Sequence, residues 1–472
     1  MLEVDTYHIP VELQQRISGE QAYQYRIVPF KEENGSVFFY SDTLEPEALS
    51  QELLIFLGYA VTIEQIDTDV LNTYLSTNFR KAFDNEKQTF TYTQDFLEKI
   101  LLTAKAIGSS DIHFEPFENR CRIRFRLDGK LKEQYSIAKD EYPVIINKIK
   151  NQANLDISQN RLPQDGRITV KTQTDEFDIR VSTLPTLDGE SIVLRILSKD
   201  TSNIHLDQLG FTEKELQIYK EGVRNPNGIV LISGPTGSGK TTTLYATLKL
   251  LNKTDTKILT IEDPIEYTLE GVMQMQLKEE IGLNFETALK TFLRQDPDII
   301  MVGEIRDVKT ANMAIRAALT GHLVLSTIHT NSAWGTISRL IDMGVPAHLI
   351  ASTLNLSVAQ RLVRKLCIHC KKEMPVEKDT FPINYKVPKE IKKHYTPQGC
   401  SHCYHTGYLG RKAIYELLPI TKDLTVHIKN NETQIDQYLE EKRIKQLSDQ
   451  AIHLIQMGET SVDDVFALLA NK

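Results

Sequence analysis

The chain has 472 residues, of which 25% are charged and 41% hydrophobic, a composition typical of a globular protein of about three domains. Its formal net charge of −8 excludes a bulk electrostatic attraction to nucleic acid or anionic lipid, so any basic surface has to be local. The longest strongly apolar uncharged stretch, residues 53–63, is well short of the roughly 18 residues of a membrane span, and no signal-peptide pattern follows the acidic start. We therefore expect a cytoplasmic protein.

Residues 1–85 predict a small α+β module. Strand patterns at residues 25–30 and 36–40 flank a Glu-Glu-Asn-Gly turn, and an apolar helix is expected at residues 47–57. The polar stretch at residues 83–93 contains few large aliphatic side chains, which favours a linker. The module contains no pattern typical of a chemical site.

Residues 86–205 predict a second α+β domain. An amphipathic helix is expected from Asp95 to a cap at Gly108, and segments of alternating polarity follow, with a hairpin turn predicted at Asp128-Gly129. The arginines of residues 120–126 alternate with apolar residues, which favours one solvated basic strand face over a nucleic-acid surface.

Residues 206–472 predict a parallel α/β sheet. Apolar strands alternate with helical patterns, such as the helix expected at residues 310–319. A cysteine-bearing insertion at residues 367–412 and a helical subdomain at residues 413–472 complete this domain. The candidate strands are residues 229–233, 257–261, 299–303 and 323–327.

A phosphate-binding loop is predicted after the first of these strands, because Gly234-Pro-Thr-Gly-Ser-Gly-Lys-Thr matches G-x-x-x-x-G-K-[ST] between a strand and a helix. Lys240 is expected to bridge the β- and γ-phosphates of ATP or GTP, and the Thr241 hydroxyl to bind Mg²⁺. Backbone N–H groups of the loop would hold the phosphates. The expected nucleotide-binding residues are Gly234, Pro235, Thr236, Gly237, Ser238, Gly239, Lys240, Thr241 and Thr242.

Hydrolysis also requires a carboxylate, and the apolar strand at residues 299–303 places Glu304 at its carboxyl end, where ligands of such sheets bind. The aspartate usual at this strand end is replaced by Gly303, which favours Glu304 as the group that orients the attacking water. Glu262 or Asp263, after the strand at 257–261, is the candidate for a second acid, with a plain surface loop as the alternative.

Two histidines, His322 and His329, lie at opposite ends of the strand at residues 323–327. Each is interpreted either as a sensor of the γ-phosphate or as a hydrogen-bonded structural histidine.

A zinc site is predicted from two Cys-x-x-Cys pairs, which supply four thiolates in the pattern of a closed structural site in a reducing compartment. A redox pair or unreactive thiols are the alternatives. The fifth cysteine, Cys121, is expected to serve packing. The four expected ligands are Cys367, Cys370, Cys400 and Cys403.

These motifs together resemble the secretion ATPases of type II secretion and type IV pilus assembly, the GspE/PulE/PilB group. Four motifs occur in the order of that family, and the resemblance covers about residues 95–472. It implies a RecA-like P-loop core, a preceding α+β (PAS-like) domain, a tetracysteine zinc module, and ATP, Mg²⁺ and Zn²⁺ as cofactors. The four motifs are the phosphate loop at 234–241, the aspartate box at 262–267, the atypical Walker B at 298–307 and the histidine box at 320–333.

The resemblance also implies roles for arginines, which would place positive charge against the phosphates when subunits close. Structural salt bridges are the alternative for each of them. Lys290 stands where the family is expected to have an arginine. From the second domain the candidates are Arg180 and Arg195, and from the ATPase domain Arg294, Arg306 and Arg339.

The function implied by the resemblance is that of a cytoplasmic hexameric motor. It would hydrolyse ATP and drive an inner-membrane platform protein in pilus or pseudopilus assembly or in protein secretion, with residues 1–85 docking to an adaptor. Peripheral membrane association would come through these partners, and no direct nucleic-acid contact is expected. The alternatives are a pilus retraction motor, a nucleic-acid translocase with the same core, and a nucleotide switch that does not hydrolyse.

Overall fold

The fold is described from a computed structural model, in which contacts divide the chain into two units. The smaller unit is built mostly from residues 1–88, and the larger unit holds most of the remaining chain. No helix among the described residues combines the length and the apolar character needed to cross a membrane. The structure describes residues 9, 13, 16–17, 19–33, 35–78, 88–90, 96–171, 176–197, 205–377, 379–388 and 390–470.

The smaller unit contains a three-stranded sheet of order β1-β2-β3, in which β1 and β2 are antiparallel and β2 and β3 parallel. Val28, Phe39 and Leu53 are buried in its core. The predicted strands and the predicted helix are confirmed, while most of the predicted linker lies outside the described residues. The elements are α2 (Gly19–Gln24), β1 (Ile27–Glu33), β2 (Ser36–Ser41), α3 (Pro46–Leu57), β3 (Ala60–Gln65) and α4 (Thr68–Asn78).

The larger unit begins with a seven-stranded sheet of order β4-β7-β6-β5-β10-β9-β8. The predicted hairpin turn is confirmed, since Asp128 and Gly129 both have positive φ, at 47° and 85°, between β6 and β7. The prediction of a separate PAS-like domain at residues 86–205 stays a prediction. Its elements are β4 (Gln88–Phe90), α5 (Phe96–Ala106), β5 (Asp111–Pro116), β6 (Cys121–Leu127), β7 (Lys130–Ile137), α6 (Tyr142–Gln152), β8 (Gln164–Lys171), β9 (Glu176–Thr186) and β10 (Gly189–Leu197).

Strand β6 has one buried face and one half-buried face, as its alternating polarity predicts. Its residues alternate strictly between buried and half-buried, so the apolar side chains and Cys121 face the core. The arginines on the other face are paired with acids: Arg122 with Glu115 at 2.7 Å and Arg126 with Asp111 at 3.0 Å. This face is therefore a network of ion pairs rather than a free basic surface.

A second seven-stranded sheet follows, of order β13-β12-β14-β15-β11-β16-β19. All of its neighbouring strands are parallel except β16 and β19, which are antiparallel. Its elements up to β16 are η1 (Leu206–Gln208), α7 (Glu213–Val223), β11 (Gly228–Ser233), α8 (Lys240–Leu251), β12 (Ile258–Glu262), β13 (Val272–Gln276), η2 (Glu279–Ile281), α9 (Phe285–Phe292), β14 (Ile299–Val302), α10 (Val308–Leu319), β15 (Leu323–Ile328), α11 (Ala333–Asp342), α12 (Ala347–Thr353) and β16 (Leu354–Leu366).

The four predicted strands are confirmed as β11, β12, β14 and β15. Every residue of these strands is buried, because helices cover both faces of a parallel sheet and leave no solvated side. The predicted helix at residues 310–319 is confirmed as α10. The carboxyl ends of the parallel strands meet at one edge, and this edge positions the candidate site.

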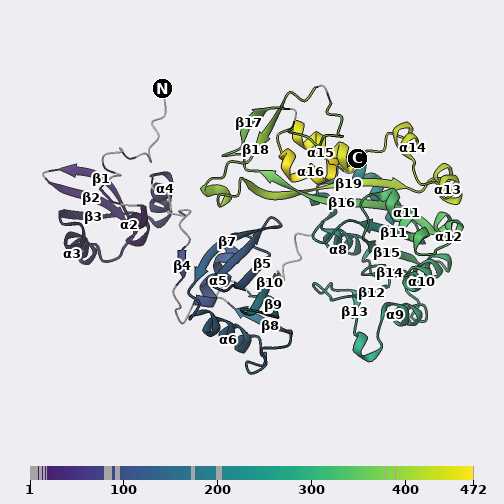
Figure 1. The fold of residues 1–472 in the computed structure, drawn as a ribbon, viewed down its shortest axis with the longest axis horizontal. Helices are drawn as coiled ribbons and strands as arrows, with labels where there is room; N and C mark the ends of the chain where they lie inside the picture. Colours follow the sequence, from purple (N-terminus) through teal and green to yellow (C-terminus); the bar gives the residue numbers. More distant parts are fainter. Residues whose placement is uncertain are drawn as a thin grey trace. The chain divides into compact units, whose positions relative to one another are not determined.

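The end of the chain combines strands with helices. Figure 1 shows β16 and β19 as long strands lying side by side, and β19 continues seven residues beyond the predicted domain boundary at residue 412. Helices begin only after this strand. The remaining elements are β17 (Lys372–Pro375), β18 (Lys393–Thr396), η3 (Ser401–Cys403), β19 (Tyr408–Pro419), α13 (Lys422–Lys429), α14 (Asp436–Glu441), α15 (Leu447–Gln456) and α16 (Val462–Ala470).

Candidate active site and metal centre

The glycine-rich loop connects the buried strand β11 to helix α8, as predicted. Gly239 precedes the first helical residue and has φ +85°, and Gly237 has φ +78°, a conformation that side-chain-bearing residues rarely adopt. The loop therefore turns sharply and directs the amino end of α8 toward the carboxyl edge of the sheet. A helix amino end with free N–H groups favours an anion.

Lys240 is held against its own loop. Its Nζ donates hydrogen bonds to the carbonyl oxygens of Gly234 at 2.8 Å and Pro235 at 3.1 Å. Burial lowers the pKa of Lys240 from its usual value, the charge of Glu304 opposes this shift, and Arg361 adds to it. The ammonium group is thus surrounded by weak acceptors, and a phosphate oxygen would be a stronger partner.

The loop also fits a phosphate by the space and the polar groups that it offers. The Ser238 hydroxyl oxygen is buried and has no hydrogen-bond partner within the part of the chain that the structure describes. No described atom lies within 4 Å of the position that a Cβ on Gly237 would take. A buried polar group without a partner costs free energy unless a ligand satisfies it. Both observations indicate room for a ligand with acceptor oxygens.

A cavity of about 750 Å³ lies in front of this loop. It is lined by the loop residues from Thr236 to Thr242, by Glu262 and Asp263 of the aspartate box and by Glu304. The predicted nucleotide-binding residue Pro235 lies instead at a separate cavity of about 650 Å³. Other residues lining the first cavity are Ser110, Ile196, Leu197, Leu244, Tyr245, Pro264, Glu266, Tyr267, Phe285, Met301, Gly303, Arg306, Thr327, His329, Leu362 and Arg411.

Glu304 follows β14 at the carboxyl edge of the sheet, as the sequence predicts. Its carboxylate forms an ion pair with Arg306 and lies 3.4 Å from Nε2 of His329. The pairing with Glu304 raises the pKa of Arg306 above its usual value. A carboxylate, a guanidinium and an imidazole are therefore gathered on the side of the cavity that faces Lys240.

The structure separates the two histidines of the histidine box. His329 follows β15 and lines the cavity. His322 precedes the same strand, and its Nδ1 lies 2.9 Å from the carbonyl oxygen of Ala317, at the end of α10. The histidine at the amino end of the strand is therefore hydrogen-bonded beside α10, while the one at the carboxyl end lies at the cavity.

Glu262 ends β12 and is only 3% exposed. Its carboxylate accepts hydrogen bonds from Tyr245, from Oγ1 of Thr260 at 2.6 Å and from Nε2 of Gln274 at 3.1 Å. This network, rather than a surface loop, surrounds the first acid of the aspartate box. Its neighbour Asp263 is exposed and also lines the cavity.

Three arginines that the resemblance implied to be nucleotide ligands make other contacts. Arg180 donates to the carbonyl oxygen of Ile265 at 2.8 Å and lies 3.3 Å from Glu266, so it contacts the aspartate box. Arg195 pairs with Asp111 at 2.8 Å. The third, Arg294, is exposed and bonds Thr291. Unlike Arg306, none of these three arginines is among the described residues that line the cavity. Arg339 is exposed as well, and Lys290 pairs with Glu286.

No sequence motif predicts several of the residues that line the cavity. Tyr245 and Tyr267 pack edge to face, with ring centroids 4.5 Å apart, and Leu362 and Arg411 reach the cavity from β16 and β19. Tyr267 is the last residue of the aspartate box, but Tyr245, Leu362 and Arg411 belong to none of the four motifs, and they come from segments up to about 170 residues away from the phosphate loop. Only the strand order brings them together.

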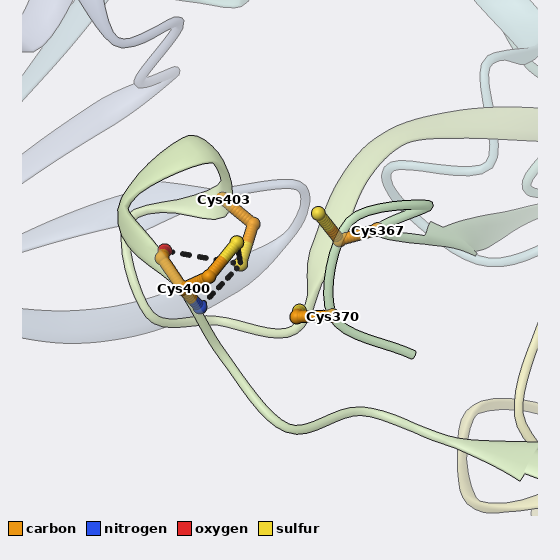
Figure 2. A group of neighbouring side chains, drawn as sticks. All are labelled: Cys367, Cys370, Cys400 and Cys403. Atoms are coloured by element: carbon orange, nitrogen blue, oxygen red, sulfur yellow. Dashed lines mark hydrogen bonds between the residues drawn. The ribbon is translucent and has the colours of Figure 1, made fainter. Parts of the chain in front are cut away.

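The four cysteines of the two Cys-x-x-Cys pairs form one cluster. Figure 2 shows Cys367 and Cys370 on one loop facing Cys400 and Cys403 on the other, and all four sulfurs lie within 4.8 Å of one another. The first loop follows β16, and the second contains η3. Sequence spacing predicted the set of ligands, and the structure brings the two pairs together.

The cluster fits a tetrahedral zinc ion. A Zn–S bond of about 2.3 Å implies sulfur atoms about 3.8 Å apart in a tetrahedron. Sγ of Cys400 and Sγ of Cys403 are separated by 3.8 Å. When bound, zinc would supply structural cross-linking rather than chemistry, because four thiolates leave no open position. The fifth cysteine, Cys121, is buried apart from this cluster in β6, and burial raises the pKa of its thiol.

Chelation of zinc from the purified protein is expected to unfold residues 367–412 before the parallel sheet that carries the phosphate loop, because binding free energy at such sites is folding free energy. Hydrogen exchange followed by mass spectrometry, with and without a strong chelator, measures this difference. The control is Cys370→Ser, which should already show the exposed pattern and respond little to chelator. An unchanged exchange and melting profile after verified metal removal would contradict the site.

Comparison with known proteins agrees with this geometry. The family model described as "Type II/IV secretion system protein" matches residues 86–467. The chain is 46% identical over 379 residues to the type IV pilus assembly ATPase PilB of Pseudomonas aeruginosa, covering 78% of this chain and 66% of that protein. It is 44% identical over 370 residues to the putative type II secretion system protein E of Escherichia coli, covering 78% and 75%. The chain thus spans slightly less than two thirds of the first relative.

Solved structures share the fold. The ATPase DotB of Legionella pneumophila superposes with a TM-score of 0.60 at 21% identity, covering 82% of this chain and 98% of that chain. The pilus retraction motor PilT with bound ADP has a TM-score of 0.52 at 25% identity, covering 78% and 95%. The likeness to DotB supports the arrangement of the sheet and its helices.

Proposed function

The chain belongs to the family of type II/IV secretion system proteins, and from this premise we propose that it is a motor ATPase that powers pilus or pseudopilus assembly or type II protein secretion. The observation that carries the proposal is one cavity in which the phosphate loop faces Glu304 and His329. Phosphoryl transfer requires a glycine-rich loop, a lysine and a carboxylate at the edge of the sheet, and this cavity contains all three.

In the proposed reaction, loop N–H groups and Lys240 bind the phosphates of ATP. Thr241 is exposed and lines the cavity, and its hydroxyl would hold Mg²⁺, which when bound would supply positive charge to the phosphate oxygens. Glu304 orients the attacking water and accepts its proton. His329, beside Glu304, reports the state of the terminal phosphate.

Positive charge for the transition state comes from arginines. Arg306 exchanges its ion pair with Glu304 for a phosphate oxygen, which frees the carboxylate to act on water. Arg180 already contacts the aspartate box through Ile265 and Glu266, so movement of the second domain would change that box directly. Arg195 and Arg294 reach the nucleotide only after such a movement.

The motor is a homo-hexamer at the inner face of the cytoplasmic membrane. Residues 86–205 supply arginines, residues 206–472 form the RecA-like ATPase domain with its zinc insertion, and residues 1–85 dock to a cytoplasmic adaptor. ATP hydrolysis drives an inner-membrane platform protein. The 46% identity to PilB, which is a pilus assembly ATPase, favours assembly over retraction.

A nucleic-acid translocase with the same core is the second candidate, and the charge distribution disfavours it. The net charge is −8, and the arginines of β6 are paired with acids. The deciding experiment measures ATP turnover by the purified chain with and without DNA, and with membranes that contain a pilus or type II secretion platform protein. Stimulation by those membranes alone supports the proposal, and stimulation by DNA alone overturns it.

Deletion of residues 1–85 is expected to abolish recruitment to the membrane but to leave ATP turnover within about twofold of the full chain. The reason is that, within the part of the chain that the structure describes, the residues lining the cavity begin at Ser110. Co-sedimentation with membranes of the native host and a turnover assay measure the two properties. Loss of turnover with intact recruitment would contradict the assignment of this module.

A further inference from the structure

Strand β16 lies beside the phosphate-loop strand β11 and carries Gln360, which is only 2% exposed. Its amide Nε2 donates a hydrogen bond to the carbonyl oxygen of Ser238 at 2.8 Å, and its Oε1 accepts one from Oγ1 of Thr243 at 2.9 Å. Both bonds are buried. One side chain thus joins the phosphate loop to the first turn of α8 from a strand more than 100 residues later in the chain.

The bond to Ser238 determines where a loop N–H group points. The carbonyl of Ser238 and the N–H of Gly239 belong to one planar peptide unit, and in a trans peptide they point in opposite directions. A donor that holds the carbonyl away from the cavity therefore orients the Gly239 N–H. Thr243, in turn, fixes which end of the Gln360 amide faces the loop.

The glycines of the loop are adapted to this neighbour. A Cβ on Gly239 would lie 2.8 Å from Nε2 of Gln360, and a Cβ on Gly234 would lie 2.5 Å from its carbonyl oxygen. These distances are too short for a side chain, so the loop packs directly on the backbone and amide of Gln360. The contact is a close fit rather than an incidental hydrogen bond.

We propose that Gln360 is a positioning residue for phosphate binding, which orients the Gly239 N–H by holding the Ser238 carbonyl. The inference rests on the proposed ATPase function and adds to it a residue outside the recognised motifs. Gln360 does not touch the nucleotide. It strengthens the binding of the phosphates equally in the ground state and in the transition state. Loss of Gln360 should therefore raise KM and leave kcat nearly unchanged.

The test uses two substitutions in the full-length protein. Gln360→Met keeps the length of the side chain and removes the donor without adding charge, and Gln360→Glu removes the donor and keeps an acceptor for Thr243. For both variants we expect ADP affinity, measured by calorimetric titration, to fall about tenfold and the KM for ATP to rise by the same factor. The kcat should stay within about twofold of wild type.

The matched control is Gln450→Met. Gln450 is a buried glutamine on α15 whose amide donates to Glu215, and it does not line the cavity among the described residues. Its substitution should lower the melting temperature without changing ADP affinity or KM. Melting curves of all variants without nucleotide separate lost stability from lost affinity.

The outcomes distinguish this inference from the proposed function. If folded Gln360→Met binds ADP as tightly as wild type, the positioning role is overturned while the ATPase assignment stands. If kcat falls and KM is unchanged, Gln360 acts on the chemical step and the proposal is again wrong. Failure of the wild-type protein to bind ADP or hydrolyse ATP would instead overturn the proposed function.

Discussion

Replacing Lys240 with alanine is expected to weaken ATP binding by about 100-fold or more and to abolish measurable turnover. Each hydrogen bond between a charged group and its partner contributes about 1.5–3 kcal/mol, and the ammonium group is expected to make two of them to phosphate oxygens. Two such bonds correspond to at least about two factors of ten in affinity. Calorimetric titration with ATP and a phosphate-release assay measure the two effects.

The matched control is Lys253→Ala, which removes the same charge from an exposed position just beyond α8. It should bind and hydrolyse ATP like wild type. The protein with Lys240→Ala should remain folded, because this side chain bonds only carbonyls of its own loop among the described residues. Tight ATP binding by the folded Lys240→Ala variant would contradict the role of the loop.

Glu304→Gln is expected to bind ATP with at least wild-type affinity and to lower kcat by about 10²- to 10⁴-fold, the usual contribution of a general base. The amide keeps the size of the side chain but cannot accept a proton from water. It also removes the negative charge that Arg306 and His329 now face, which leaves both groups available to the phosphates. Single-turnover measurements separate binding from the chemical step.

Glu280→Gln serves as the control, because Glu280 is an exposed acid on η2 that does not line the cavity among the described residues. It should hydrolyse ATP normally. If Glu304→Gln also hydrolyses ATP normally, the water-activating role moves to Glu262, whose buried carboxylate is the next acid along the sheet edge. A parallel Glu262→Gln variant then decides between the two acids.

Elements that depend on local patterns could be predicted from the amino-acid sequence. Buried parallel strands appear as short apolar runs, and the phosphate loop appears as glycines before Lys240, because backbone conformation and burial constrain residue type at each position. Strand direction also placed Glu304 at the carboxyl edge. The same argument could have separated His329 from His322, since only the residue after a strand reaches that edge.

Contacts between side chains that are distant in the sequence could be found only from the folded chain. Gln360 bonds Ser238 because β16 pairs with β11, and Arg180 bonds the aspartate box because β9 lies beside the segment that follows β12; neither contact leaves a pattern in the chain. The physical reason is that such contacts depend on strand order, register and side-chain direction, which the whole core determines. Local sequence determines the conformation of a segment, and long-range packing determines its partners.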